Sequence, residues 1–143
     1  MKKIFFSLIT LLFVISHTVY AQSKTGYPKL KGPEPTPLNC KQYRDGTFKI
    51  TLLKKTTIIK RSGSTELDYP QGSTIPIVYK VKWKNDCTYT LTPTRETLKK
   101  YPDIKKNTVL TVEIVQQNTN SFTQVVSANY TKAKTNCEVY KIK

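Results

Sequence analysis

Residues 76–92, PIVYKVKWKNDCTYTLT, decide the fold class of this chain. The apolar residues Tyr79, Val81 and Trp83 alternate with lysines, so a β-strand here would bury one face and expose the other. Asn85-Asp86 is a turn signal, and after it apolar residues alternate again, this time with threonines. The stretch therefore predicts an antiparallel hairpin of two strands, 76–84 and 87–92.

The same β character continues on both sides of this hairpin, because Thr, Val, Ile and Tyr dominate from residue 40 onward. Residues 93–107 break the alternation, and we expect a short helix or loop near 94–101. The other predicted strands are 47–53, 56–61, 65–69, 108–116, 121–130 and 137–142. About eight strands in sequential hairpins predict an all-β antiparallel meander that closes into a small barrel, because closure removes unpaired edges. A β-sandwich is the alternative.

The first 39 residues form two segments that precede the β domain. Lys2 and Lys3, the apolar run 4–19 and the small residues Val19 and Ala21 make the pattern of a secretory signal peptide, residues 1–21. Residues 22–39 are rich in proline, which favours an extended leader. We therefore expect an exported protein, periplasmic or secreted, with a single β domain at 40–143 and no membrane-spanning segment after cleavage.

Removal of the signal peptide changes which chemistry the chain can perform. It takes away His17, the single histidine, and lowers the formal charge from +15 to +13 because Lys2 and Lys3 are lost. A chain without histidine cannot use Ser-His-Asp or Cys-His catalysis and lacks the main ligand of catalytic zinc. No other catalytic motif is present, and we expect a protein that is not an enzyme and uses no cofactor or metal.

Three cysteines, Cys40, Cys87 and Cys137, allow one internal disulfide and leave one thiol over. Export favours a disulfide over structural zinc, which usually takes four ligands. Cys40 precedes the first predicted strand and Cys87 opens the fifth. Odd-numbered strands of a meander start at the same end, so we predict a Cys40–Cys87 bridge. Cys137 opens the eighth predicted strand, at the opposite end, and should be the unpaired thiol.

Charged residues suggest two further candidate sites. Three lysines form a row on the outward face of strand 76–84, namely Lys80, Lys82 and Lys84. We predict that this row binds polyanions such as an acidic polysaccharide or an anionic lipid surface. Specific nucleic-acid recognition is disfavoured, because lysine outnumbers arginine and no stacking motif is present. Glu66 and Asp68 share a strand face that we expect to be solvated on the outer surface; an enclosed pair could act in glycoside hydrolysis.

Three segments resemble known sequences. Residues 39–48 (NCKQYRDGTF), 58–61 (IIKR) and 83–91 (WKNDCTYTL) are similar to a group of small exported β-proteins of environmental Gram-negative bacteria. Some members of that group carry the name DNA topoisomerase IV, which this chain does not support, because it is too short and has no Gly-rich ATP-binding motif. Gly46-Thr47-Phe48 also resembles the Gly-x-Trp of lipocalin-like barrels, with phenylalanine replacing tryptophan, and this resemblance implies an eight-strand meander.

Together these observations indicate an exported, non-enzymatic binding or interaction module with a strongly basic surface. The alternatives are a periplasmic inhibitor of a hydrolase and, with less support, a small hydrolase. A hollow barrel interior with converging polar groups would favour ligand binding, and a solid core would favour interaction through the surface. Buried paired carboxylates would favour catalysis.

Overall fold

The structure, a computed structural model, describes residues 37–143. The predicted signal peptide and nearly all of the predicted leader lie outside the described residues. The elements are the 3-10 helix η1 (Cys40–Tyr43), β1 (Gly46–Leu52), β2 (Lys55–Ser62), β3 (Thr65–Pro70), β4 (Ile77–Trp83), β5 (Thr88–Pro93), α1 (Arg95–Lys100), β6 (Leu110–Gln117), β7 (Ser121–Ala128) and β8 (Lys134–Lys141).

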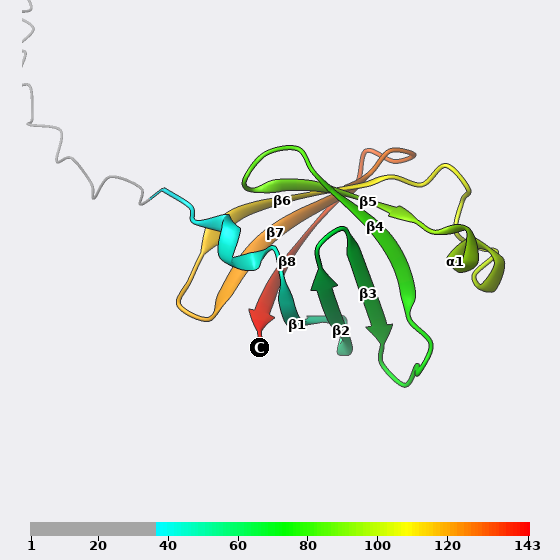
Figure 1. Cartoon of the computed structure of the whole chain (residues 1–143), viewed down its shortest axis with the longest axis horizontal. Coiled ribbons are helices and arrows are strands. Elements are labelled where there is room, and N and C mark those ends of the chain that lie inside the picture. The colour runs from blue at the N-terminus through cyan, green and yellow to red at the C-terminus, as the bar shows by residue number, and fades with distance from the viewer. Residues whose placement is uncertain (1–36) are drawn as a thin grey trace, which may run out of the picture. The chain divides into compact units, whose positions relative to one another are not determined.

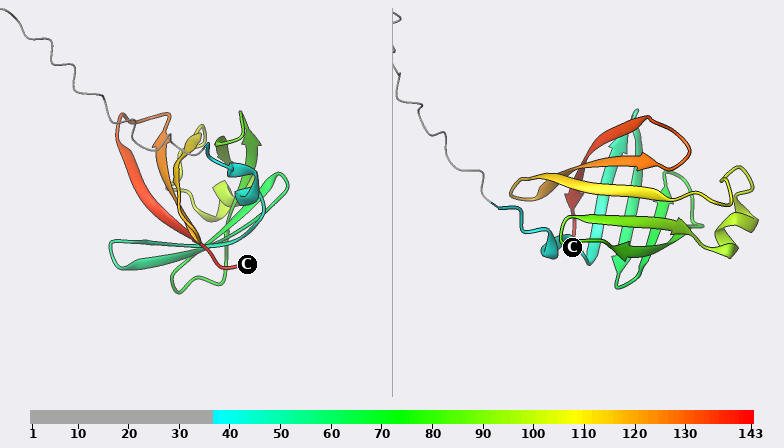
Figure 2. Two further views of the ribbon diagram at one scale, coloured as in Figure 1. Left: turned by 90° about the vertical axis from the view of Figure 1, so that its left-hand side faces the viewer. Right: turned by 90° about the horizontal axis from the view of Figure 1, so that it is seen from above.

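The strands form a closed antiparallel barrel in which each strand pairs with the next one along the chain. β8 returns to pair with β1, through Val139–Lys141 and Phe48–Ile50. The ribbon shows the meander in sequence order (Figure 1), and the other views show β1–β3 crossing the direction of β5–β7 on the far side of the barrel (Figure 2). The predicted all-β barrel is confirmed, and the sandwich alternative is wrong.

The hairpin of residues 76–92 forms as β4 and β5. Tyr79 and Val81 of β4 and Tyr89 and Leu91 of β5 are buried in the barrel interior, while the lysines between them on β4 are exposed. Val81 lies opposite Leu91 in the register. Because directly opposite residues point to the same face, the alternation seen in the sequence places both apolar rows in the core.

The predicted short helix also forms, as α1 after β5. Thr94 caps it by accepting a hydrogen bond from Thr97 N, and this satisfies one of the free amides of the first turn. The Thr97 hydroxyl in turn donates to the Val78 carbonyl at 2.9 Å, which attaches α1 to β4. In the described part of the chain, no helix is long and apolar enough to cross a bilayer.

One end of the barrel is closed by η1. Cys40 is bonded to Cys87, just before β5, with 5.2 Å between the two Cα atoms, so the predicted disulfide is confirmed. Tyr43 is buried and its ring lies 4.3 Å from that of Phe122, centroid to centroid. The interior of this half is filled by the buried side chains of Phe48, Ile59, Ile114, Phe122 and Val139.

Gly46 begins β1 directly after this closed end. Its φ is 141°, and a Cβ atom at this position would lie 2.7 Å from the backbone oxygen of Lys143. Both facts require glycine, because other residues rarely adopt this φ and the neighbouring atom is backbone. The first residue of the Gly-x-Phe motif is therefore explained by the close approach of the C-terminus to β1.

Candidate functional site

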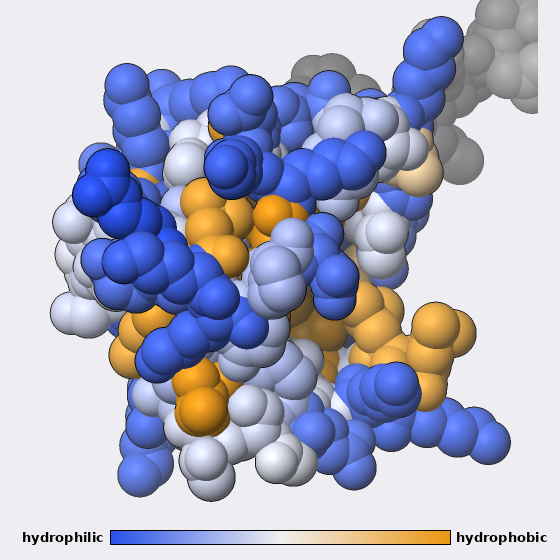
Figure 3. Space-filling view, turned by 90° about the vertical axis from the view of Figure 1, so that its right-hand side faces the viewer, coloured by the Kyte–Doolittle hydropathy of each residue, from blue (hydrophilic) through white to orange (hydrophobic). Residues whose placement is uncertain are grey.

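The other half of the barrel interior is only partly filled, by a second cluster of buried side chains that includes Tyr79, Val81, Leu91 and Val112. A cavity of about 240 Å³ lies among β1, β2, β3, β5, β6, β7 and β8, with mostly Ile, Leu and Val side chains on its walls. Leu52 is 41% exposed and Thr135 is exposed as well, so the cavity reaches solvent where β1 ends and β8 begins. On the face of the molecule that carries α1, apolar side chains show in the middle, framed by hydrophilic ones (Figure 3).

A buried ion pair stands between this cavity and the filled half of the core. The Arg61 Nε donates to Glu66 Oε2 at 2.5 Å, and the two residues are 3% and 1% exposed. The other guanidinium nitrogens are also used: Nη1 donates to the Tyr43 carbonyl at 2.8 Å, and Nη2 donates to the Tyr89 hydroxyl at 2.5 Å. All three nitrogens of Arg61 thus have partners within the protein.

The position of Glu66 and Asp68 corrects the sequence analysis, which expected a solvated outer face. Both carboxylates line the interior cavity. In the register of β2 and β3, Arg61 lies opposite Glu66 and Ile59 lies opposite Asp68. Because Ile59 and Arg61 point inward, the residues opposite them must point inward too. The turn consists of Gly63 and Ser64 alone, so counting outward from it pairs Ser62 with Thr65 and Arg61 with Glu66, a relation that the sequence prediction overlooked.

Asp68 has a carboxylate oxygen with no partner. Its Oδ1 is buried and accepts no hydrogen bond. Burial, and next the charge of Glu66, raise the pKa of the Asp68 carboxyl well above its usual range, although Arg61 opposes this. The cavity wall therefore holds an acid whose ionised form lacks a cation of its own.

Four more polar side chains line the cavity, namely Tyr89, Gln124, Thr135 and Cys137. The Tyr89 hydroxyl donates to Gln124 Oε1 at 3.4 Å, and burial raises the pKa of Tyr89, which keeps the phenol protonated. Cys137 is the free cysteine, as predicted, and burial raises the pKa of its thiol. It does not open the eighth strand, however: β8 begins at Lys134, so Cys137 lies within the strand and in the cavity wall.

The two interior carboxylates are poorly placed for hydrolysis. Glycoside hydrolysis needs two carboxyl groups on opposite sides of the scissile bond, one of them a free base or nucleophile. Glu66 and Asp68 lie on the same wall, with Cα atoms about 7 Å apart along one strand and side chains in contact with each other, and Glu66 is occupied by Arg61. The geometry thus suits the holding of a small molecule better than its cleavage.

Two lysines of the predicted row, Lys80 and Lys82, lie on the outside of β4, on the opposite side of the sheet from the cavity, and Lys84 directly follows the strand. Lys80, Lys82 and Lys84 are all exposed, as the alternation predicted. Lys80 and Lys82 border a surface hollow that also contains threonines of β3 and β5. The structure brings this row together with hydroxyl groups, and it keeps the row apart from the interior carboxylates.

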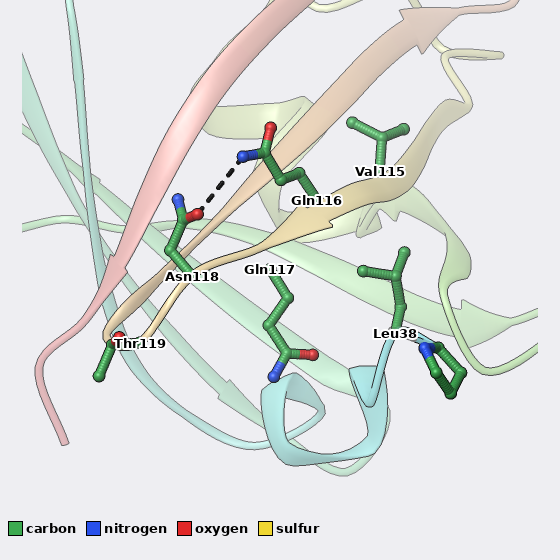
Figure 4. Close-up of a pocket in the computed structure, with 7 residues that line it drawn as sticks. Leu38, Val115, Gln116, Gln117, Asn118 and Thr119 are labelled. Atoms are coloured by element: carbon green, nitrogen blue, oxygen red, sulfur yellow. Dashed lines mark hydrogen bonds between the residues drawn. The ribbon is translucent and has the colours of Figure 1, made fainter. Parts of the chain in front are cut away.

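Another surface hollow, of about 820 Å³, lies between residues 37–38 and the hairpin of β6 and β7 (Figure 4). Its amide side chains are engaged with one another or with the residue before η1: Gln116 Nε2 donates to Asn118 Oδ1 at 3.4 Å, and Gln117 Oε1 accepts from Asn39 N at 2.9 Å. These contacts explain the amides as structural. Across residues 37–143, no group of three or more His, Cys, Asp or Glu side chains could hold a metal ion.

Comparison with protein-family models, curated proteins and solved structures finds no match to this chain.

Proposed function

We propose that this chain is an exported, non-enzymatic binding protein that holds a small ligand inside its barrel. The observation that carries the proposal is the interior cavity of about 240 Å³, which has apolar walls, converging polar groups and an opening to solvent. Ligand sites of proteins share this design, although many are larger, at roughly 300–1,000 Å³. The ligand is therefore small, on the order of eight non-hydrogen atoms at roughly 30 Å³ each.

Export is part of the proposal and rests on two observations. Residues 1–21 have the pattern of a signal peptide, and the described domain contains a disulfide, which persists in oxidising compartments. The mass of the protein recovered from outside the cytoplasm tests it. We expect cleavage between Ala21 and Gln22, and an uncleaved chain held in the membrane would contradict export.

Interior binding can be tested with small neutral aromatic molecules. Toluene and benzyl alcohol should shift the amide resonances of the cavity-lining residues Leu91, Val112 and Gln124 in a two-dimensional NMR titration. Val126→Phe places a larger side chain in the cavity and should weaken both molecules at least tenfold. Val125→Phe, on the outer face of the same strand, is the matched control. Equal binding by the two variants, or no binding by the wild type, would overturn the proposal.

A second candidate function is binding of polyanions by the outer lysine row. Exposed cations stand at Lys80 and Lys82 on β4 and at Lys84 directly after it, and the first two border a hollow lined by hydroxyl groups. Affinity for a sulfated polysaccharide matrix should fall steeply with salt, because bound counterions are released on contact. Replacing Lys80, Lys82 and Lys84 with Gln should weaken retention more than the same change at Lys99, Lys100 and Lys105. Equal losses would show that net charge alone is responsible.

A further inference from the structure

The interior polar cluster indicates what kind of molecule the cavity takes. Three charged side chains meet there, and they do not balance when all of them are ionised: Arg61 carries one positive charge, while Glu66 and Asp68 carry one negative charge each. The charge of Arg61 neutralises that of Glu66 in their ion pair. A cation from outside the chain would balance the second carboxylate.

The hydrogen-bonding capacity of the cluster points the same way. Each nitrogen of the Arg61 guanidinium already donates one hydrogen bond, to Glu66, Tyr43 or Tyr89, and Arg61 is not among the residues that line the cavity, so it does not offer a site for an anionic ligand there. Asp68 Oδ1, in contrast, is a buried acceptor with no donor. Leaving such a group without a partner costs free energy that a donor on the ligand would recover.

We infer that the cavity binds a small primary amine with an apolar body, its ammonium group against the Asp68 carboxylate and its body among Ile59, Leu91 and Val112. This inference rests on the proposed function, interior binding, and names its ligand class. An ammonium group donates to the free oxygen and also neutralises the charge. A carboxylate ligand would meet two negative groups, and an alcohol would satisfy the oxygen without balancing the charge.

The inference also predicts how binding depends on pH. The groups that face Asp68 are Arg61 from β2, Glu66 from β3, Tyr79 from β4, Tyr89 from β5 and Cys137 from β8. Because the pKa of Asp68 is raised, the carboxyl must lose its proton when an ammonium group binds. Affinity for the amine should therefore rise with pH until Asp68 is ionised, and each binding event below that pH should release a proton.

The experiment compares four ligands of nearly equal size: benzylamine, benzyl alcohol, toluene and benzoate. Calorimetry at slightly alkaline pH should give benzylamine an affinity on the order of tenfold to a hundredfold above benzyl alcohol, as expected of a hydrogen bond to a charged partner. Calorimetry in buffers of different ionisation enthalpy should show the proton release. Asp68→Asn should abolish both the amine preference and the proton release, whereas Asp103→Asn, at an exposed loop position, should keep both.

The outcomes separate the two proposals. Equal or tighter binding of benzyl alcohol, toluene or benzoate, or an amine preference that survives Asp68→Asn, overturns the assignment to amines and leaves interior binding standing. Failure of all four molecules to bind overturns interior binding, and the amine assignment falls with it.

Discussion

Removing the buried guanidinium, by Arg61→Met, should be among the most damaging changes to this fold. Methionine fills much of the same space but donates no hydrogen bond. Glu66, 1% exposed, would then be a buried charge without a partner, and the Tyr43 carbonyl and the Tyr89 hydroxyl would each lose a donor. Breaking a buried ion pair from one side typically costs about 3–5 kcal/mol. That is a large part of the roughly 5–15 kcal/mol by which domains are stable.

The assay is urea unfolding followed by the fluorescence of Trp83, the single tryptophan of the chain. We expect the free energy of unfolding of Arg61→Met to be lower by about 3 kcal/mol or more, with a melting temperature more than about 10 °C lower. Arg95→Met, in which an exposed arginine of α1 is replaced, is the control and should change stability by less than about 0.5 kcal/mol.

A double variant separates the ion pair from simple packing. Replacing both partners, as Arg61→Met with Glu66→Leu, removes the unpaired charge and should cost at least about 1 kcal/mol less than the sum of the two single changes. If the single changes simply add, or if Arg61→Met is as mild as Arg95→Met, the reasoning about a coupled buried pair is wrong.

Three further predictions follow from the same contacts. Reduction of the Cys40–Cys87 bridge, whose cysteines are 47 residues apart, should cost up to about 4 kcal/mol of unfolding free energy by the loop-entropy relation, and an unchanged urea midpoint would contradict this. The raised pKa of Asp68 means that the folded protein binds more protons than the unfolded chain between about pH 4 and that pKa, so unfolding free energy should fall as pH rises through this window. Asp68→Asn should flatten that dependence, and an unchanged slope in pH-dependent urea titrations would show that the Asp68 carboxyl does not cause it. Burial raises the pKa of the Cys137 thiol, so it should react slowly with a small disulfide reagent, and more slowly still with benzyl alcohol present; equal rates would place the thiol outside the cavity.

Much of the fold follows from local patterns in the sequence. The alternation of residues 77–91 identifies β4, β5 and their inward faces, and the prediction survives because one face of each strand is buried. The disulfide follows from strand order alone, since Cys40 and Cys87 both precede odd-numbered strands. Both predictions succeed because, in a chain of sequential hairpins, each strand pairs with the next one and alternate strands start at the same end of the barrel.

The candidate site was harder to predict, for a physical reason. In residues 65–69, TELDY, the apolar Leu67 stands between two acids, and alternation by polarity assigns Leu67 to the interior. The barrel reverses this assignment, because Arg61 points inward and pairs with Glu66 across the turn. Polarity rules fail where a buried charge is compensated by another strand, and that compensation is visible only once the register is known.

The junction between β8 and β1 has a consequence for how the chain folds. All the other strand pairs join neighbours in the sequence. In this pair, Thr47 N donates to Lys143 O and Phe48 lies opposite Lys141. The two strands are the first and the last of the barrel, so their pairing closes a loop that contains nearly the whole domain. Local hairpins can form early, whereas contacts between distant segments are delayed by the entropy of closing a long loop. We therefore expect barrel closure to be the slow, late event, and a chain interrupted before its last strand to present β1 as an open edge to other chains.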